Sequence, residues 1–96
     1  MILEVATLDV RAGQEEAFEE TFKRALPLIA GMHGYVSHQI RRCLENPSRY
    51  ILLVEWAKLE DHTQGFRGSP QYQEWRALLH HFYDPFPTVE HYRDPV

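Results

Sequence analysis

Histidine is the side chain best suited to proton chemistry near neutral pH, and this chain is rich in it. No two of its histidines stand four residues apart, none forms a His-x-His pair, and none completes a Glu-x-x-His motif. The spacing therefore provides no local metal-binding motif, and we expect solvated or hydrogen-bonded imidazoles and no metal. A site built by histidines that converge from distant segments is an alternative that the spacing does not decide. The six histidines are His33, His38, His62, His80, His81 and His91.

Other reactive motifs are few. Cys43 is the single cysteine and could act as a thiol nucleophile, but a buried structural cysteine is the commoner case, so we assign it no role. The five glycines never fall in a G-x-G-x-x-G or P-loop spacing, and no G-x-S-x-G elbow is present. We therefore expect no nucleotide cofactor bound by such a loop and no acyl-transfer triad of that design.

One segment joins a titratable imidazole to aromatic side chains. It runs from Trp56 to Arg76 and holds His62 near its start. An imidazole beside aromatic walls could bind a small aromatic molecule and exchange a proton with it. A capping or loop histidine, and aromatic residues that only pack the core or a dimer, are the competing explanations.

The elements that must position this segment alternate between strand and helix periods. Residues 2–10 are β-branched and partly alternating, which predicts a strand, and helical spacing follows from Gln14 to about residue 30. Pro27 should kink or shorten that helix. Residues 35–44 and 50–56 predict a hairpin, and residues 88–93 a last strand.

A second helix is predicted after one or two short turns over residues 61–66. Ser69 has the position of an N-cap, with Pro70 at the first helical position. The helix should bury Tyr72, Trp75, Leu79 and Phe82. The order β-α-β-β-α-β predicts a ferredoxin-like α+β fold with a four-stranded antiparallel sheet, as one domain over residues 1–96.

Both faces of this sheet are apolar in the sequence. Tyr50, Leu52, Val54 and Trp56 share one face of the third strand, while Ile51 and Leu53 are on the other. Two helices can cover only one face of a four-stranded sheet. A 96-residue chain also buries little core on its own, so we predict a homodimer that packs its sheets face to face.

Charge and composition narrow the choice of partners. The chain has 10 Lys and Arg against 14 Asp and Glu, with no basic stripe, so neither nucleic acid nor an anionic membrane is an expected partner. No export signal or membrane-spanning run is evident. With one cysteine and no disulfide framework, a reducing cytoplasmic location is expected.

Several short motifs also point to a known family. Glu55-Trp56 ends a strand, Glu60-Asp61-His62 follows it, and Phe66-Arg67-x-Ser69-Pro70-x-Tyr72 leads into a helix. Two earlier features belong to the same pattern: Gly13 precedes Glu15-Glu16-Ala17-Phe18, and Pro27, Gly31 and Gly34 lead into the second strand. On these motifs the chain resembles the antibiotic biosynthesis monooxygenase (ABM) domain family along nearly its whole length. The resemblance implies a ferredoxin-like fold that dimerises into an α+β barrel.

The resemblance implies three possible activities. The first is cofactor-independent oxygenation of an electron-rich phenol or quinol, whose deprotonated form can give dioxygen an electron without a flavin or metal. The second is a non-catalytic dimeric barrel that binds a small aromatic molecule or regulates a partner. The third is haem binding or degradation, which in that family uses a helix histidine, an asparagine and a tryptophan. The position that matches the tryptophan falls here near Phe66, and the position that matches the histidine falls near Trp75 or Arg76. The first strand has no asparagine. His80 or His81 would therefore have to bind the iron.

Our leading hypothesis is the cofactor-independent monooxygenase. His62 is the candidate base, because a neutral imidazole can accept a phenol proton near pH 7, and Arg76 or Arg67 could stabilise the phenolate. Apolar walls would keep water from the reacting pair. An open pocket with His62 facing inwards beside an arginine would favour the enzyme, whereas a cavity filled by Trp75, Leu79 and Phe82 would favour a chain that binds nothing. The expected substrate-binding residues are Trp56, Phe66, Arg67, Tyr72, Trp75 and Phe82.

Overall fold

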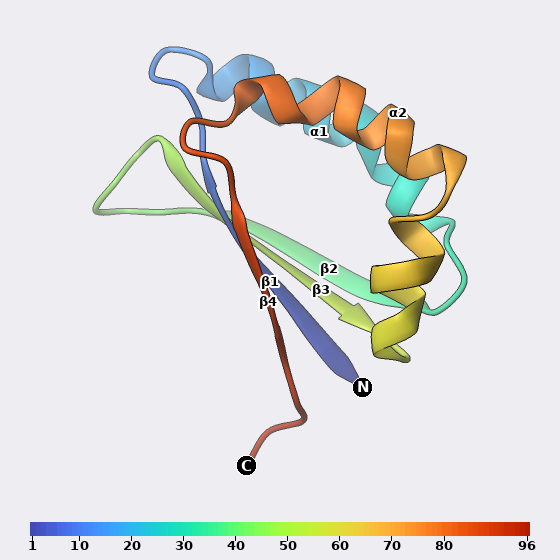
Figure 1. Ribbon diagram of the computed structural model, residues 1–96. Coiled ribbons are helices and arrows are strands. Elements are labelled where there is room, and N and C mark those ends of the chain that lie inside the picture. Colours follow the sequence, from blue (N-terminus) through green and yellow to red (C-terminus); the bar gives the residue numbers. More distant parts are fainter.

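The computed structural model describes all 96 residues, and its elements follow the predicted order (Figure 1). A helical turn of π type, η1, connects β3 to α2, and a short 3-10 turn, η2, follows α2. No helix is both long and apolar enough to cross a membrane. The elements are β1 (Ile2–Asp9), α1 (Glu15–Ala30), β2 (Tyr35–Arg42), β3 (Arg49–Trp56), η1 (Asp61–Phe66), α2 (Pro70–Leu79), η2 (His80–Phe82) and β4 (Thr88–Tyr92).

The four strands form one antiparallel sheet in the order β2-β3-β1-β4. The two chain-terminal strands are therefore neighbours, and their register places Glu4 opposite His91. Both helices lie side by side on one face of the sheet, as Figure 1 shows. This arrangement confirms the ferredoxin-like α+β fold expected from the sequence.

The covered face of the sheet and the inner faces of the helices form the core. From β3 it receives Tyr50, Leu52, Val54 and Trp56, the row that the alternation placed on one face. The α1 contribution includes Phe18, Ala25 and Ile29. The same alternation in β1 puts Ala6 and Leu8 inside, and with them one acidic residue, Glu4, which is only 5% exposed.

The helix boundaries follow local chemistry closely. The Ser69 side-chain oxygen accepts a hydrogen bond from the Tyr72 backbone N–H at 3.1 Å, and Pro70 occupies the first turn of α2, which confirms the predicted cap. Pro27 lies inside α1, which ends three residues later at Ala30. Trp75, Leu79 and Phe82 are buried as predicted, whereas Tyr72 is only half-buried. Phe82 belongs to η2 and not to α2, because α2 ends at Leu79.

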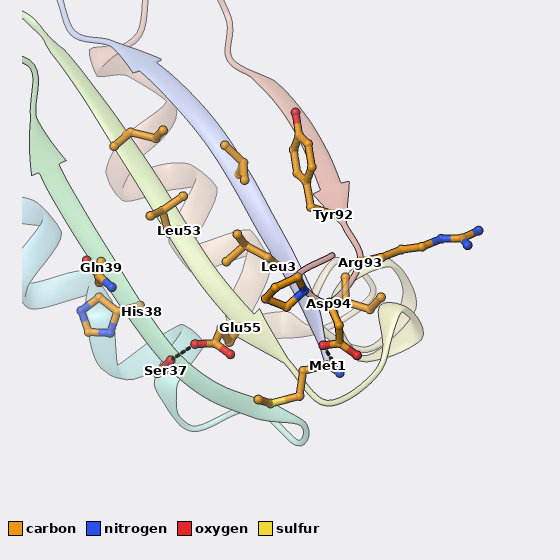
Figure 2. A pocket seen from close by; sticks show the side chains of 14 residues that line it. Met1, Leu3, Ser37, His38, Gln39, Leu53, Glu55, Tyr92, Arg93 and Asp94 are labelled. Atoms are coloured by element: carbon orange, nitrogen blue, oxygen red, sulfur yellow. Dashed lines mark hydrogen bonds and ion pairs between the residues drawn. The ribbon is translucent and has the colours of Figure 1, made fainter.

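The other face of the sheet has no helix over it. Leu3 and Val5 of β1 lie beside Ile51 and Leu53 of β3, and together they floor a shallow hollow of about 640 Å³. Figure 2 shows this hollow with Leu3, Leu53 and Tyr92 on the sheet and polar side chains around them. Ser37 donates to Glu55 at 3.2 Å, and the N-terminal amine pairs with Asp94 at 3.0 Å on this rim. The second apolar face predicted from β3 is therefore present.

Candidate active site

A cavity of about 410 Å³ lies between the sheet and the helical layer. Its volume is within the range of about 300 to 1,000 Å³ that small-molecule sites occupy. Most of the lining residues are apolar or aromatic, while polar atoms contribute about as much of the exposed wall as apolar atoms do. From the sheet come Glu4, Ala6, Leu8, Leu52 and Val89; from the helical layer and the segment after it come Ile29, His62, Phe66, Arg67, Tyr72, Trp75, His80, Tyr83, Phe86 and Pro87.

A buried polar cluster forms one part of the cavity wall. The indole N–H of Trp56 donates to Oε1 of Glu4 at 3.0 Å, and Nε2 of His62 lies 3.3 Å from the same oxygen. The His62 ring stacks on Trp56, with ring centroids 5.3 Å apart and planes 21° from parallel. His62 is 3% exposed, so the carboxyl and the imidazole are held together away from bulk water.

The second ring nitrogen of His62 is also engaged. Nδ1 of His62 lies 2.7 Å from Nε2 of His91, a short hydrogen-bond distance. His91 is half-buried on β4, directly across the strand pair from Glu4. Glu4, His62 and His91 thus form a continuous chain of polar groups from the cavity to the outer strand.

Burial determines the charges in this cluster. Burial raises the pKa of the Glu4 carboxyl, although the Trp56 N–H and the charge of Arg67 lower it. Burial lowers the pKa of His62 to about 3, and the charges of Arg67 and His91 act in the same direction. His62 is therefore a neutral imidazole at pH 7, with one N–H and one acceptor nitrogen. Its contact with Glu4 is polar, and not an ion pair of full charges.

Arg67 provides the cationic part of the cavity wall. It lies just after η1, is exposed, and takes part in none of the ion pairs of the chain. Its charge lowers the pKa of Glu4, His62 and His91 alike. An unpaired guanidinium at the edge of a cavity lined mostly by apolar residues is suited to an anionic oxygen of a ligand.

Aromatic rings line the helical side of the cavity in sequence. Phe66 meets Tyr72 and Trp75 edge to face, with ring centroids 5.3 Å and 5.7 Å apart. The Tyr72 ring then contacts His80 at 6.1 Å, and His80 contacts the exposed Phe86 at 5.1 Å. Burial lowers the pKa of His80, with the charge of Arg76 as a second cause, so His80 is also neutral at pH 7. This wall can pack against a flat, apolar ligand.

Comparison with known proteins identifies the family of this chain. The family model described as antibiotic biosynthesis monooxygenase matches residues 1–78. The chain belongs to the antibiotic biosynthesis monooxygenase family. YczJ, an uncharacterized protein of Bacillus subtilis, is 56% identical over 94 residues, which cover 98% of this chain and 99% of YczJ.

Solved structures of this ABM type share the fold throughout. A Bordetella bronchiseptica protein named for the same family superposes with a TM-score of 0.94 at 34% identity, covering 99% of this chain and 97% of the other. A variant of SnoaB, a cofactor-independent oxygenase from Streptomyces nogalater, superposes with a TM-score of 0.85 at 17% identity, covering 99% and 93%. The SnoaB likeness is one of fold alone.

The residues singled out from the sequence divide into two groups in this ABM-family chain. The cavity wall contains His62, Phe66, Arg67, Tyr72 and Trp75. It includes none of the remaining three, Trp56, Arg76 and Phe82. The segment after β3 therefore contributes these five residues to the cavity, and other segments supply the rest of the wall.

Each of the three misplaced residues has a physical reason. Arg76 follows Trp75 on α2, so it is rotated by about 100° to the exposed face. Trp56 is fully buried and acts on the cavity through its hydrogen bond to Glu4 and through its stacking on His62. Phe82 is buried against Phe18, with ring centroids 5.7 Å apart.

The sequence also left out residues that the fold brings to the cavity, above all Glu4. A carboxylate at an inward position of the first strand, in phase with Ala6 and Leu8, was the signal that could have found it. No group of three His, Cys, Asp or Glu side chains is arranged to hold a metal ion. Of the two histidines considered as alternative ligands for haem iron, His80 lines the cavity and His81 does not.

Proposed function

We propose that the chain is a cofactor-independent monooxygenase that acts on a small phenolic or quinol-type aromatic bound in the cavity. The observation that carries the proposal is the buried Glu4–His62 pair in the wall of a cavity that also presents Arg67. The cavity remains open beside Trp75, so the core side chains do not fill it. Its aromatic wall and its cationic edge are suited to an aromatic ring that bears an ionisable hydroxyl.

We assign proton abstraction to Glu4 and not to His62. The low pKa of His62, about 3, makes its imidazole a weak base, and both of its nitrogens already face protein groups. The Glu4 carboxylate has a raised pKa, which makes it the stronger base, and it lines the cavity. Arg67 would then stabilise the phenolate that forms.

The overall reaction balances without a cofactor. The phenolate gives one electron to dioxygen, the resulting radicals combine into a carbon-bound peroxide, and loss of water leaves a carbonyl. For a phenol with a hydrogen at the reacting carbon, the substrate and dioxygen become a quinone and water. One oxygen atom enters the product, the other leaves in water, and the substrate supplies all the electrons.

We further propose that a second copy of the chain covers the open face of the sheet. Leu3, Val5, Ile51 and Leu53 form a contiguous apolar surface there, with polar residues around it, and such a surface is typical of an interface. The barrel formed by two sheets would also fix the edge strand β4, which carries His91.

Oxygen uptake tests the activity. The wild type, Glu4→Gln and Glu74→Gln are supplied in turn with anthrones and hydroquinones at an oxygen electrode. We expect uptake by the wild type, a fall in kcat of about 10²- to 10⁴-fold for Glu4→Gln, and no change for Glu74→Gln, which alters an exposed residue of α2. Tight binding of these compounds with no uptake would instead favour the non-catalytic barrel, and equal rates in all three proteins would remove Glu4 as the base.

A further inference from the structure

His62 lies between Glu4 and His91 and so lies between the base and the solvent. The inference drawn from this position rests on the proposed function of Glu4. Glu4 is 5% exposed and His62 is 3% exposed, whereas His91 is only half-buried. A ligand in the cavity would separate Glu4 further from bulk water. A carboxylate that takes one proton in each turnover needs a way to lose it.

We propose that His62 and His91 form the path by which Glu4 exchanges its proton with solvent. The contacts run in series from Oε1 of Glu4 to Nε2 of His62 at 3.3 Å, and from Nδ1 of His62 to Nε2 of His91 at 2.7 Å. Hydrogen bonds of catalytic groups are often long without substrate and shorten when it binds, so the 3.3 Å step is within reach.

The proton count of the path balances. In one arrangement Glu4 is ionised, His62 carries its proton on Nε2, and Nε2–H of His91 donates to Nδ1 of His62. In the other, Glu4 is protonated and donates to Nε2 of His62, and Nδ1–H of His62 donates to His91. The second arrangement holds one proton more than the first. A shift of one proton along each of the two contacts interconverts them, and the additional proton leaves or enters at Nδ1 of His91.

The surroundings keep this shift available. A neutral His62 can donate through one nitrogen and accept through the other, which a charged imidazole cannot do. The groups that face the pair are Glu4 across the strands and Arg67 after η1, with Trp56 stacked on His62. Burial, and after it the charge of Arg67, disfavour a lasting positive charge on His91, so a proton that arrives there is released to water. His91 is thus a positioning and proton-transfer residue, and does not contact the substrate in this path.

Exchange of the His62 ring proton with water tests the path without any need for activity. It is measured by magnetisation transfer in ¹⁵N-labelled wild type, His91→Phe and His91→Gln, and in the control His33→Phe, which alters a side chain that is 96% exposed. Anthrone is added to occupy the cavity. We expect exchange at least tenfold slower in both His91 variants and unchanged in the control; His91→Gln keeps a polar side chain in case the phenylalanine disturbs folding.

Equal exchange rates in the wild type and a folded His91 variant would overturn the path. If the wild type consumes oxygen, we also expect the His91 variants to have a kcat at least tenfold lower with an unchanged KM. Added imidazole should restore part of the lost kcat. A merely structural role of His91 would not give this response. A wild type that consumes no oxygen would contradict the proposed function, while the exchange rates would still decide the path.

Discussion

Acid should destabilise this protein through His62, and the size of the effect follows from its pKa. The unfolded imidazole takes up a proton below about pH 6.5, whereas in the folded chain the pKa of His62 is about 3. Between these values the unfolded state binds more protons, so stability falls as the pH falls. At pH 5 the protonated form of the unfolded imidazole exceeds the neutral form about thirtyfold. The free energy of unfolding is therefore lower by about 2 kcal/mol at pH 5 than at pH 7.5.

Glu4 acts in the opposite direction. Its pKa is raised on folding, so its contribution is present at low pH and is lost as the pH rises through the folded value. Comparison with a variant removes this background. His62→Gln cannot titrate but keeps a polar side chain between Glu4 and His91, and His33→Gln makes the same change at an exposed position. The loss of unfolding free energy between pH 7.5 and pH 5 should be about 2 kcal/mol smaller in His62→Gln than in the wild type, and unchanged in His33→Gln.

Urea unfolding followed by tryptophan fluorescence measures the difference. Trp56 and Trp75 are both buried, so their emission reports loss of the core. The protein concentration is held constant, because association with a second copy would shift the apparent stability. An acid loss of the same size in His62→Gln and in the wild type would refute the account of His62 as a neutral, buried imidazole.

Two further predictions concern the open face and the cationic edge of the cavity. Light scattering should give a mass of twice 11.4 kDa for the wild type. Leu53→Lys should shift the mass toward 11.4 kDa, because the new charge would lie in the apolar surface of β3. A wild-type mass of 11.4 kDa at micromolar concentration would exclude the dimer. Arg67→Gln should move the acidic limb of the oxygen-uptake profile to higher pH, since the charge of Arg67 lowers the pKa of Glu4, whereas Arg76→Gln should leave that limb in place. An unmoved limb in Arg67→Gln would show that this guanidinium does not act on the base.

Local sequence patterns were sufficient to predict the fold. The alternation in β3, the helical spacing of α1 and the Ser69-Pro70 start of α2 each depend on neighbouring residues, and each is found in the structure. The second apolar face also follows from alternation alone, since Ile51 and Leu53 are out of phase with the core row.

The candidate site was harder to predict because it depends on contacts between distant segments. His62 was found as an imidazole among aromatic residues, but its partners are 58 residues before it and 29 after it. Glu4 and His91 meet only because β1 and β4 are neighbours in a particular register. Phe82 was misplaced because the sequence did not reveal that α2 ends at Leu79.

Anaerobic absorption spectroscopy shows directly whether Glu4 removes a proton from a bound ligand. Anthrone is mixed with the protein without oxygen, and the longer-wavelength absorption of its deprotonated form is recorded for the wild type, Glu4→Gln and Glu74→Gln. We expect the deprotonated spectrum with the wild type and Glu74→Gln, and the neutral spectrum with Glu4→Gln. A deprotonated ligand in Glu4→Gln, at the same level as in the wild type, would contradict the role of Glu4 as the base.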